Sequence, residues 1–194
     1  MSGEEKQSPQ PVLLGLLMNE PRHGYDLYQE LSDDLGQVWQ VGLSQAYAQL
    51  KQLEEAGMVT SQVEPQEGRP ARKVYHLTPG GRDLFLDWVR QPVPYLRHIR
   101  VEFLARLYFY RRLRLDGLDE LVERQKAVCR EQIERFAHIA GEAEDDFRRL
   151  VLEFRIGQLQ AVTEWLDRCV EVTDGEAVVT QRYTEPNRDT GREE

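Results

Sequence analysis

Apolar residues in the first third of the chain recur at the spacing of α-helices. Pro11 suits the first turn of one helix, and Gly36 and Gly57 are suited to end the next two. The pattern therefore predicts three helices between residues 11 and 57. The apolar positions that define the second and third of these helices are Leu27 and Leu31, and then Ala46, Leu50 and Leu53.

The hydrophobic period changes after Gly57. Residues 58–65 (MVTSQVEP) and 72–78 (RKVYHLT) are rich in β-branched and aromatic residues, and the Gly/Pro segment 66–71 (QEGRPA) separates them. We expect an antiparallel hairpin with a long tip. Thr78 and Pro79 are suited to the N-cap and first position of a further helix, which we expect to run through Gln91.

The segment PVP at 92–94 breaks the helical pattern and marks the predicted domain boundary. Beyond it, long amphipathic helices are predicted at about 98–115, 118–140 and 143–171. The fold class is mainly α with a small β-hairpin: a winged helix-turn-helix followed by an α-helical dimerisation domain. The predicted organisation is a flexible leader at 1–10, a winged helix-turn-helix domain at 11–91, a helical domain at 95–171, and a polar, mostly disordered tail at 172–194.

The chain of 194 residues is acidic, with a formal net charge of −9, which argues against binding nucleic acid through bulk charge. A small basic patch can still bind it. Arg69, Arg72 and Lys73 fall within five positions, and we expect them at the end of the hairpin, placed to neutralise phosphates. In a winged helix-turn-helix the third helix enters the major groove and the hairpin, or wing, rests on the backbone or the minor groove.

The third predicted helix carries polar residues opposite its apolar face. Gln can pair with adenine, Ser with bases or phosphates, and Lys with guanine or phosphate. A solvated surface helix has the same pattern, and the basic hairpin that follows is what favours DNA binding. The helix residues predicted to contact DNA are Ser44, Gln45, Ala48 and Lys51, and the same face also carries Gln49 and Gln52.

The predicted C-terminal helices carry more apolar surface than they can bury against one another. Two copies packed about a two-fold axis would bury it, so we expect a homodimer, with a monomeric satellite of the core as the alternative. Six arginines between residues 97 and 114 are interpreted as partners for acidic helices rather than for DNA. The residues predicted at the dimer interface are Phe103, Leu107, Tyr110, Leu159, Val162, Trp165 and Leu166.

The sequence contains no catalytic or metal-binding motif. His23 lies beside Gly24, but the histidines have no ligand spacing, so we interpret this segment as a helix entry with Tyr25 packed under the third helix. Nucleophile and nucleotide-binding motifs are also lacking. We therefore expect a protein that is not an enzyme and that binds no cofactor or metal. The polar N-terminus and the lack of an apolar run of membrane length indicate a cytoplasmic protein.

Three segments in order resemble the PadR family of bacterial transcriptional regulators: LLGLLMNEPRHGYDLYQEL, AYAQLKQLEEAGMV and EGRPARKVYHLTPGGR. The later segments EFLARLYF, LVERQK and TEWLD resemble the helical dimerisation domain of the longer members. The resemblance implies a homodimer that binds a pseudo-palindromic DNA operator, usually as a repressor and sometimes released by a small aromatic effector. Trp88, Trp165 and the aromatic residues near Tyr95 are candidates for lining an effector cavity.

The chain departs from the family where the recognition helix begins. The family commonly has S-x-G-T-L-Y-P there, whereas residues 42–48 read GLSQAYA. Tyr47 and Lys51 are retained, and we count Tyr47 among the DNA-binding residues. Because glycine is a tolerable cap, the departure concerns the preferred DNA sequence rather than the fold. Two alternatives that have lost DNA binding stay open: a winged-helix protein-interaction module and a sensor whose main event is ligand binding at the dimer seam.

Overall fold

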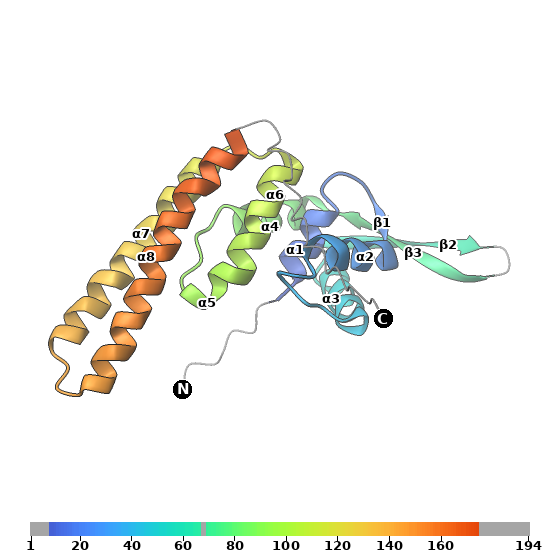
Figure 1. Ribbon diagram of the computed structural model, residues 1–194. Helices are drawn as coiled ribbons and strands as arrows, with labels where there is room; N and C mark the ends of the chain where they lie inside the picture. The colour runs from blue at the N-terminus through green and yellow to red at the C-terminus, as the bar shows by residue number, and fades with distance from the viewer. Residues whose placement is uncertain (1–7, 67–68, 175–194) are drawn as a thin grey trace, which may run out of the picture.

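The computed structural model describes residues 8–66 and 69–174. A winged helix-turn-helix unit is followed by helices that end in a long antiparallel pair (Figure 1). In Figure 1 this pair and the β-hairpin project on opposite sides of the central helices. The elements of the first unit are α1 (Gln10–Leu16), β1 (Arg22–His23), α2 (Gly24–Leu35), α3 (Leu43–Glu55), β2 (Val59–Gln66), β3 (Arg69–Leu77) and α4 (Pro79–Val89).

The sheet has three antiparallel strands in the order β1-β3-β2. The predicted hairpin of β2 and β3 is confirmed, whereas β1 was not predicted, since two residues are too short for a hydrophobic pattern. β1 pairs Arg22 with Tyr75 and His23 with Val74. β3 is longer than expected and β2 ends one residue later than expected, because their pairing continues, with one irregularity, to Gln66 opposite Arg69. The predicted long tip therefore shortens to residues 67–68, which lie outside the described residues.

Helix α1 and the third helix form the centre of the winged unit. Residues 12–16 of α1 are all buried, and α1 packs against α2, α3 and α4. Each buried leucine or valine stabilises the fold by about 1.5–3 kcal/mol relative to an exposed one. The residues predicted to face this core are indeed buried: Leu27, Leu31, Ala46, Leu50 and Leu53.

Helix α4 begins where its local signals predicted. The hydroxyl of Thr78 accepts a hydrogen bond from the backbone N–H of Gly81 at 3.1 Å, which caps the helix, and Pro79 is the first helical residue. The helix ends at Val89, two residues before the predicted Gln91. The Pro-rich segment that follows is held by α7, because the Gln125 side chain accepts from Val93 N at 2.7 Å and donates to Val93 O at 3.1 Å.

The second half contains the helices predicted after the Pro-rich segment, but the first of them is divided. A π-helical stretch lies between two α-helical ones, and Gly117 at φ 88° makes the turn into the long pair. The last helix ends at Asp174, so residues 172–174, predicted as part of a disordered tail, are helical. The rest of the predicted tail, from 175 on, lies outside the described residues. The elements are α5 (Leu96–His98), η1 (Ile99–Phe103), α6 (Leu104–Leu113), α7 (Leu118–Gly141) and α8 (Asp146–Asp174).

Part of the apolar surface predicted for the dimer interface is buried within the single chain. α7 and α8 pack along their length and, with η1 and α6, bury four of the seven predicted residues. The remaining three, Leu107, Val162 and Trp165, are half-buried. The four that are buried inside the chain are Phe103, Tyr110, Leu159 and Leu166.

Two of the six arginines between residues 97 and 114 have the acidic partners predicted for them. Arg106 is buried, donates to Trp88 O at 3.0 Å and lies 3.2 Å from Glu102, and Arg112 pairs with Glu30 and Asp34 of α2. Burial lowers the pKa of Arg106 from its ordinary value, although Glu102 opposes that shift. None of the helices in the described ranges is apolar over a length that would cross a membrane.

Candidate nucleic-acid interface

The exposed face of α3 follows from the apolar spacing of this helix. Ala46, Leu50 and Leu53 are buried against the winged unit, so the side chains opposite them are left in solvent. Gly42 occupies the N-cap with extended backbone and without a side-chain cap. The structure brings the helix residues predicted to contact DNA together on this exposed surface: Ser44, Gln45, Tyr47, Ala48 and Lys51.

Two glutamines of the same predicted face are engaged by the N-terminal residues. Ser8 Oγ donates to Gln49 Oε1 at 3.2 Å, and Gln10 Nε2 donates to Gln52 Oε1 at 2.9 Å. These contacts span about forty positions of sequence, so no local pattern could reveal them. The unengaged polar side chains lie toward the N-terminal half of α3, which is the half that contacts base edges in helix-turn-helix proteins.

The cations of the wing do not all lie at its tip, and that prediction is wrong. The β2–β3 register places Arg72 opposite Glu64 and Lys73 opposite Val63, within the paired strands. Arg72 is exposed. Arg69 begins β3, and its side chain lies outside what the structure describes.

Lys73 ties the wing to α3. Its Nζ donates to Glu54 Oε2 at 3.0 Å, and Ser61 Oγ donates to the other oxygen of Glu54 at 2.5 Å. The hydrogen bonds from Ser61 and then Lys73 lower the pKa of Glu54, and the bond to Glu54 raises the pKa of Lys73. Both groups therefore stay charged at neutral pH. This arrangement makes Lys73 a brace between the wing and α3.

The start of α2 differs from the prediction made for it. Tyr25 is 53% exposed, with its ring 6.3 Å from that of Tyr28, so it does not pack under α3. His23 lies in β1, with Nε2 3.8 Å from Glu64 Oε2 of the wing. Among residues 8–66 and 69–174, no group of His, Cys, Asp and Glu is arranged to hold a metal ion.

Two hollows lie beside α8, and the aromatic residues proposed for an effector cavity are distributed unevenly between them. One, of about 890 Å³, lies between α2, α6 and α8 and includes Tyr108 and Trp165. The other, of about 990 Å³, lies between α5, α7 and α8 and includes Tyr95 and Trp165. Trp88 lines neither hollow and packs on Phe85 and Phe109 with ring-centroid distances of 6.2 and 6.4 Å.

A third helix with an exposed polar face, braced to an antiparallel wing, defines a winged helix-turn-helix protein. The model of the "Transcriptional regulator PadR-like family" matches residues 13–86. The model "Virulence activator alpha C-term" matches residues 99–174. The winged unit is thus a PadR-like family domain, as the resemblance of its motifs predicted.

Individual proteins are also similar to this chain. The "Negative transcriptional regulator PadR" of Bacillus subtilis (strain 168) is 34% identical over 100 residues, which cover 50% of this chain and 54% of that protein. The "Probable transcriptional regulator Rv1176c" of Mycobacterium tuberculosis is 28% identical over 85 residues, 44% of each chain. The chain thus matches about half the length of these curated relatives. A crystal structure of Bacillus subtilis PadR in complex with operator DNA has a TM-score of 0.45 and 24% identity, covering 87% of this chain and 100% of that one.

Proposed function

We propose that this protein is a sequence-specific DNA-binding transcriptional regulator that acts as a cytoplasmic homodimer and has no catalytic activity. The observation that carries the proposal is the exposed polar face of α3, opposite a fully buried apolar face and braced to the wing. The match of residues 13–86 to a family of transcriptional regulators supports it. The curated relative from Bacillus subtilis is named a negative regulator, which favours repression.

In the proposed complex α3 lies in the major groove. Ser44 and Gln45 face the bases, Ala48 allows close approach, and Lys51 reaches phosphate or guanine. Lys51 lies 3.6 Å from Glu55, but both side chains are exposed, so this pair costs little to break. Tyr47 is exposed beside them.

The wing contributes to the proposed complex through a division of roles among its cations. Arg72 is exposed and has no carboxylate within ion-pairing distance in the described part of the chain, so we assign it to the DNA backbone. Arg69 is assigned to the same role from its place at the start of β3. Lys73 is already paired with Glu54, so we assign it to holding the wing against α3.

The proposed dimer seam is the exposed face of α8. Phe147, Leu150 and Phe154 are 71%, 61% and 65% exposed there, and large exposed apolar groups in a row indicate an interaction surface. Further along the same face lie two small exposed residues, Gly157 and Ala161. The large residues thus occupy the first half of the face and the small residues the second half.

This distribution of large and small residues is self-complementary in an antiparallel pair of α8 helices. Leu150 and Phe154 are four positions apart, as are Gly157 and Ala161. In one register, Phe154 therefore packs against the partner's Gly157 and Leu150 packs against the partner's Ala161. A two-fold axis repeats both contacts, as an isologous interface requires. Leu107, Val162 and Trp165 remain candidates for the edge of this seam.

A small aromatic effector is part of the proposal. The hollow between α2, α6 and α8 supports it, because Tyr108 and Trp165 offer apolar surface beside the guanidinium groups of Arg111 and Arg168. Because the hollow adjoins both α2 and α8, a bound molecule would favour one arrangement of the winged unit on the dimer over another.

The test of the proposed function is selection of bound sequences from a random DNA pool. Gln45→Ala is then expected to lose about 1–3 kcal/mol of discrimination at one base position, because a bidentate contact is removed. Lys51→Ala is expected to lower the affinity for all DNA sequences by the same factor. Gln37→Ala, an exposed glutamine outside α3, is the control. If no sequence is enriched by the parent protein, the proposal is wrong and a protein-interaction module becomes the better hypothesis.

Arg72→Ala is expected to lower the salt dependence of DNA binding. Each phosphate contact contributes roughly 0.9 to the slope of log affinity against log salt concentration, so a dimer should lose about 1.8. The measurement is a salt titration of binding to the selected site. Arg130→Ala, which removes an exposed arginine of α7, should leave the slope unchanged. An unchanged slope in Arg72→Ala would show that Arg72 contacts no phosphate.

A further inference from the structure

Helix α6 is attached to the winged unit at two places, and the first of them combines an aromatic contact with one hydrogen bond. The ring of Phe109 packs edge-on against Phe85 of α4 at a centroid distance of 5.1 Å. One turn earlier, the buried Arg106 donates to the carbonyl of Trp88. These contacts hold α6 against α4. The ring contact is not directional, so at this attachment the hydrogen bond from Arg106 is the contact that opposes rotation of α6.

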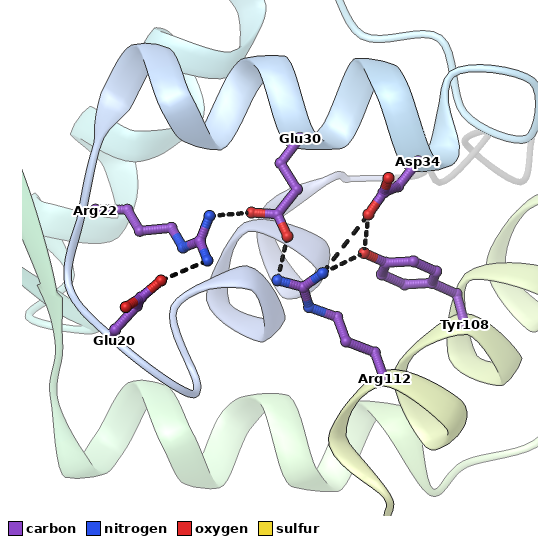
Figure 2. A network of polar contacts seen from close by, with 6 residues as sticks. All are labelled: Glu20, Arg22, Glu30, Asp34, Tyr108 and Arg112. Atoms are coloured by element: carbon purple, nitrogen blue, oxygen red, sulfur yellow. Dashed lines mark hydrogen bonds and ion pairs between the residues drawn. The ribbon is translucent and has the colours of Figure 1, made fainter.

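The second attachment is a polar cluster between α6 and α2, shown in Figure 2. Arg112 forms ion pairs with Glu30 and Asp34, the latter at 3.6 Å. The hydroxyl of Tyr108 donates to Asp34 Oδ2 at 2.5 Å and accepts from Arg112 Nη1 at 2.9 Å. We call these four residues, Glu30, Asp34, Tyr108 and Arg112, the α2–α6 clamp.

The clamp continues into the sheet. The second oxygen of Glu30 accepts from Arg22 Nη1 at 2.6 Å, and Arg22 Nη2 lies 2.6 Å from Glu20. Arg22 belongs to β1, which pairs with β3 of the wing. In Figure 2 the charges alternate along this line from Glu20 to Asp34. Helix α2 also packs against α3, so helix α6 is connected through α2 to both parts of the winged unit that the proposed complex places on DNA.

The physical setting of the clamp makes it directional and persistent. The side chains of Glu30 and Arg112 are only 13% and 23% exposed, so salt screens their attraction less than that of a surface pair. Burial first, and then the bond to Asp34, raise the pKa of Tyr108 well above its ordinary value. The hydroxyl therefore keeps its proton at neutral pH and remains a donor to Asp34.

We propose that the α2–α6 clamp sets the separation of the two recognition helices, so that Tyr108 and Arg112 are positioning residues that determine which half-site spacing the dimer accepts. This inference rests on the proposed function. One path from the α8 seam to α3 passes through α7 and α6 and then across the attachments of α6. A second joins α7 to the end of α4 and the segment after it, through Arg124 and Gln125. The Phe109 contact acts as a pivot, and the clamp, whose Arg112 lies one turn further along α6, prevents rotation about it.

Small rotations at this pivot have large effects on DNA. A small domain spans roughly 20 Å, so a rotation of about 5° displaces its far side by about 2 Å. The two-fold axis doubles this change to roughly the 3.4 Å rise of one base pair. A dimer without the clamp should therefore accept several spacings nearly equally well.

The experiment compares the full-length parent with Arg112→Met on DNA duplexes whose two half-sites are separated by different numbers of base pairs. Removing one base pair from the best spacing should lower the DNA affinity of the parent about tenfold and that of Arg112→Met only about twofold. Affinity for a duplex with a single half-site should be the same for both. For Tyr108→Phe, the loss of affinity on removing one base pair should lie between those of the parent and Arg112→Met. Lys126→Met breaks an ion pair between α7 and α8 rather than one between α6 and α2, and should behave as the parent does.

Two outcomes on DNA would overturn the proposal. One is a spacing preference in Arg112→Met as sharp as in the parent. The other is an equal loss on the single half-site, which would show that the clamp only supports the fold of the winged unit.

A second readout does not need DNA. Spin labels on the exposed Ser32 of α2 and the exposed Glu134 of α7, in dimers diluted with unlabelled chain, should give a broader distance distribution in Arg112→Met than in the parent. If the parent binds no DNA, the proposed function is wrong. The distance measurement then still tests whether the clamp holds α2 in a fixed position relative to α7. An unchanged distribution would overturn the positioning role.

Discussion

Replacing Gly157 by leucine is expected to convert the dimer into a monomer and to lower the affinity for a two-half-site operator by more than about a hundredfold, because the linkage between two binding units is lost. A Cβ added at this position would meet no atom of its own chain within 4 Å beyond the adjacent residues and the backbone of its own helix. The fold should therefore accept it, and the helix gains about 1 kcal/mol of propensity. In the antiparallel seam, however, the leucine would occupy the space of the partner's Phe154. Sedimentation equilibrium should show about 22.7 kDa in place of twice that mass.

A matched control and a rescue variant make this test specific. Gly141→Leu adds the same bulk at another exposed glycine that also has open space around it, away from the exposed face of α8, and should remain dimeric. Combining Gly157→Leu with Phe154→Ala should restore the dimer, because the new large residue then meets a new small one across the axis. Persistence of the dimer in Gly157→Leu, or failure of the rescue, would contradict the antiparallel register.

Local signals in the sequence were sufficient for most of the winged unit. Thr78 and Pro79 start α4 because a cap and a constrained φ act within one turn. The exposure of the α3 face was predictable for a similar reason, since burying Leu50 and Leu53 leaves the opposite residues in solvent. β1 could not be predicted, because its two residues become a strand only by pairing with β3.

Long-range contacts explain where the site differed from its prediction. Lys73 was expected to be a free cation at the wing tip, yet it bonds to Glu54, nineteen positions earlier, because the wing folds back on α3. Acidic partners were expected for the arginines of α6, but nothing in the pattern indicated that Arg112 would form an ion pair with Glu30 of α2. Counting apolar residues likewise predicted a dimer surface without showing that α7 and α8 bury Leu159 and Leu166 between them.

Replacing Gly81 by alanine is expected to destabilise the fold by about 3 kcal/mol, near the upper end for overpacking a core, although the change adds only one methyl group. A Cβ at this position would lie 2.1 Å from the carbonyl oxygen of Met58, far inside van der Waals contact. That carbonyl cannot easily move, because it accepts hydrogen bonds from Thr78 N at 3.2 Å and from Thr78 Oγ1 at 2.9 Å. These bonds join the start of β2 to the cap of α4, so relief of the clash would break the capped junction.

The neighbouring Gly80 provides the control for this prediction. It lies in the same turn of α4, but a Cβ there has Met58 Cε as its nearest neighbour at 3.8 Å, an ordinary contact. Gly80→Ala should therefore be neutral or stabilise the fold by up to about 1 kcal/mol, because alanine is the better helix former. Urea unfolding of both variants at one protein concentration measures the difference, since dimer stability depends on concentration. Equal midpoints would show that the β2–α4 junction yields to the added methyl group. A large loss in Gly81→Ala alone would show that the base of the wing is held rigidly against α4, which is the condition for the wing to keep a defined position beside α3.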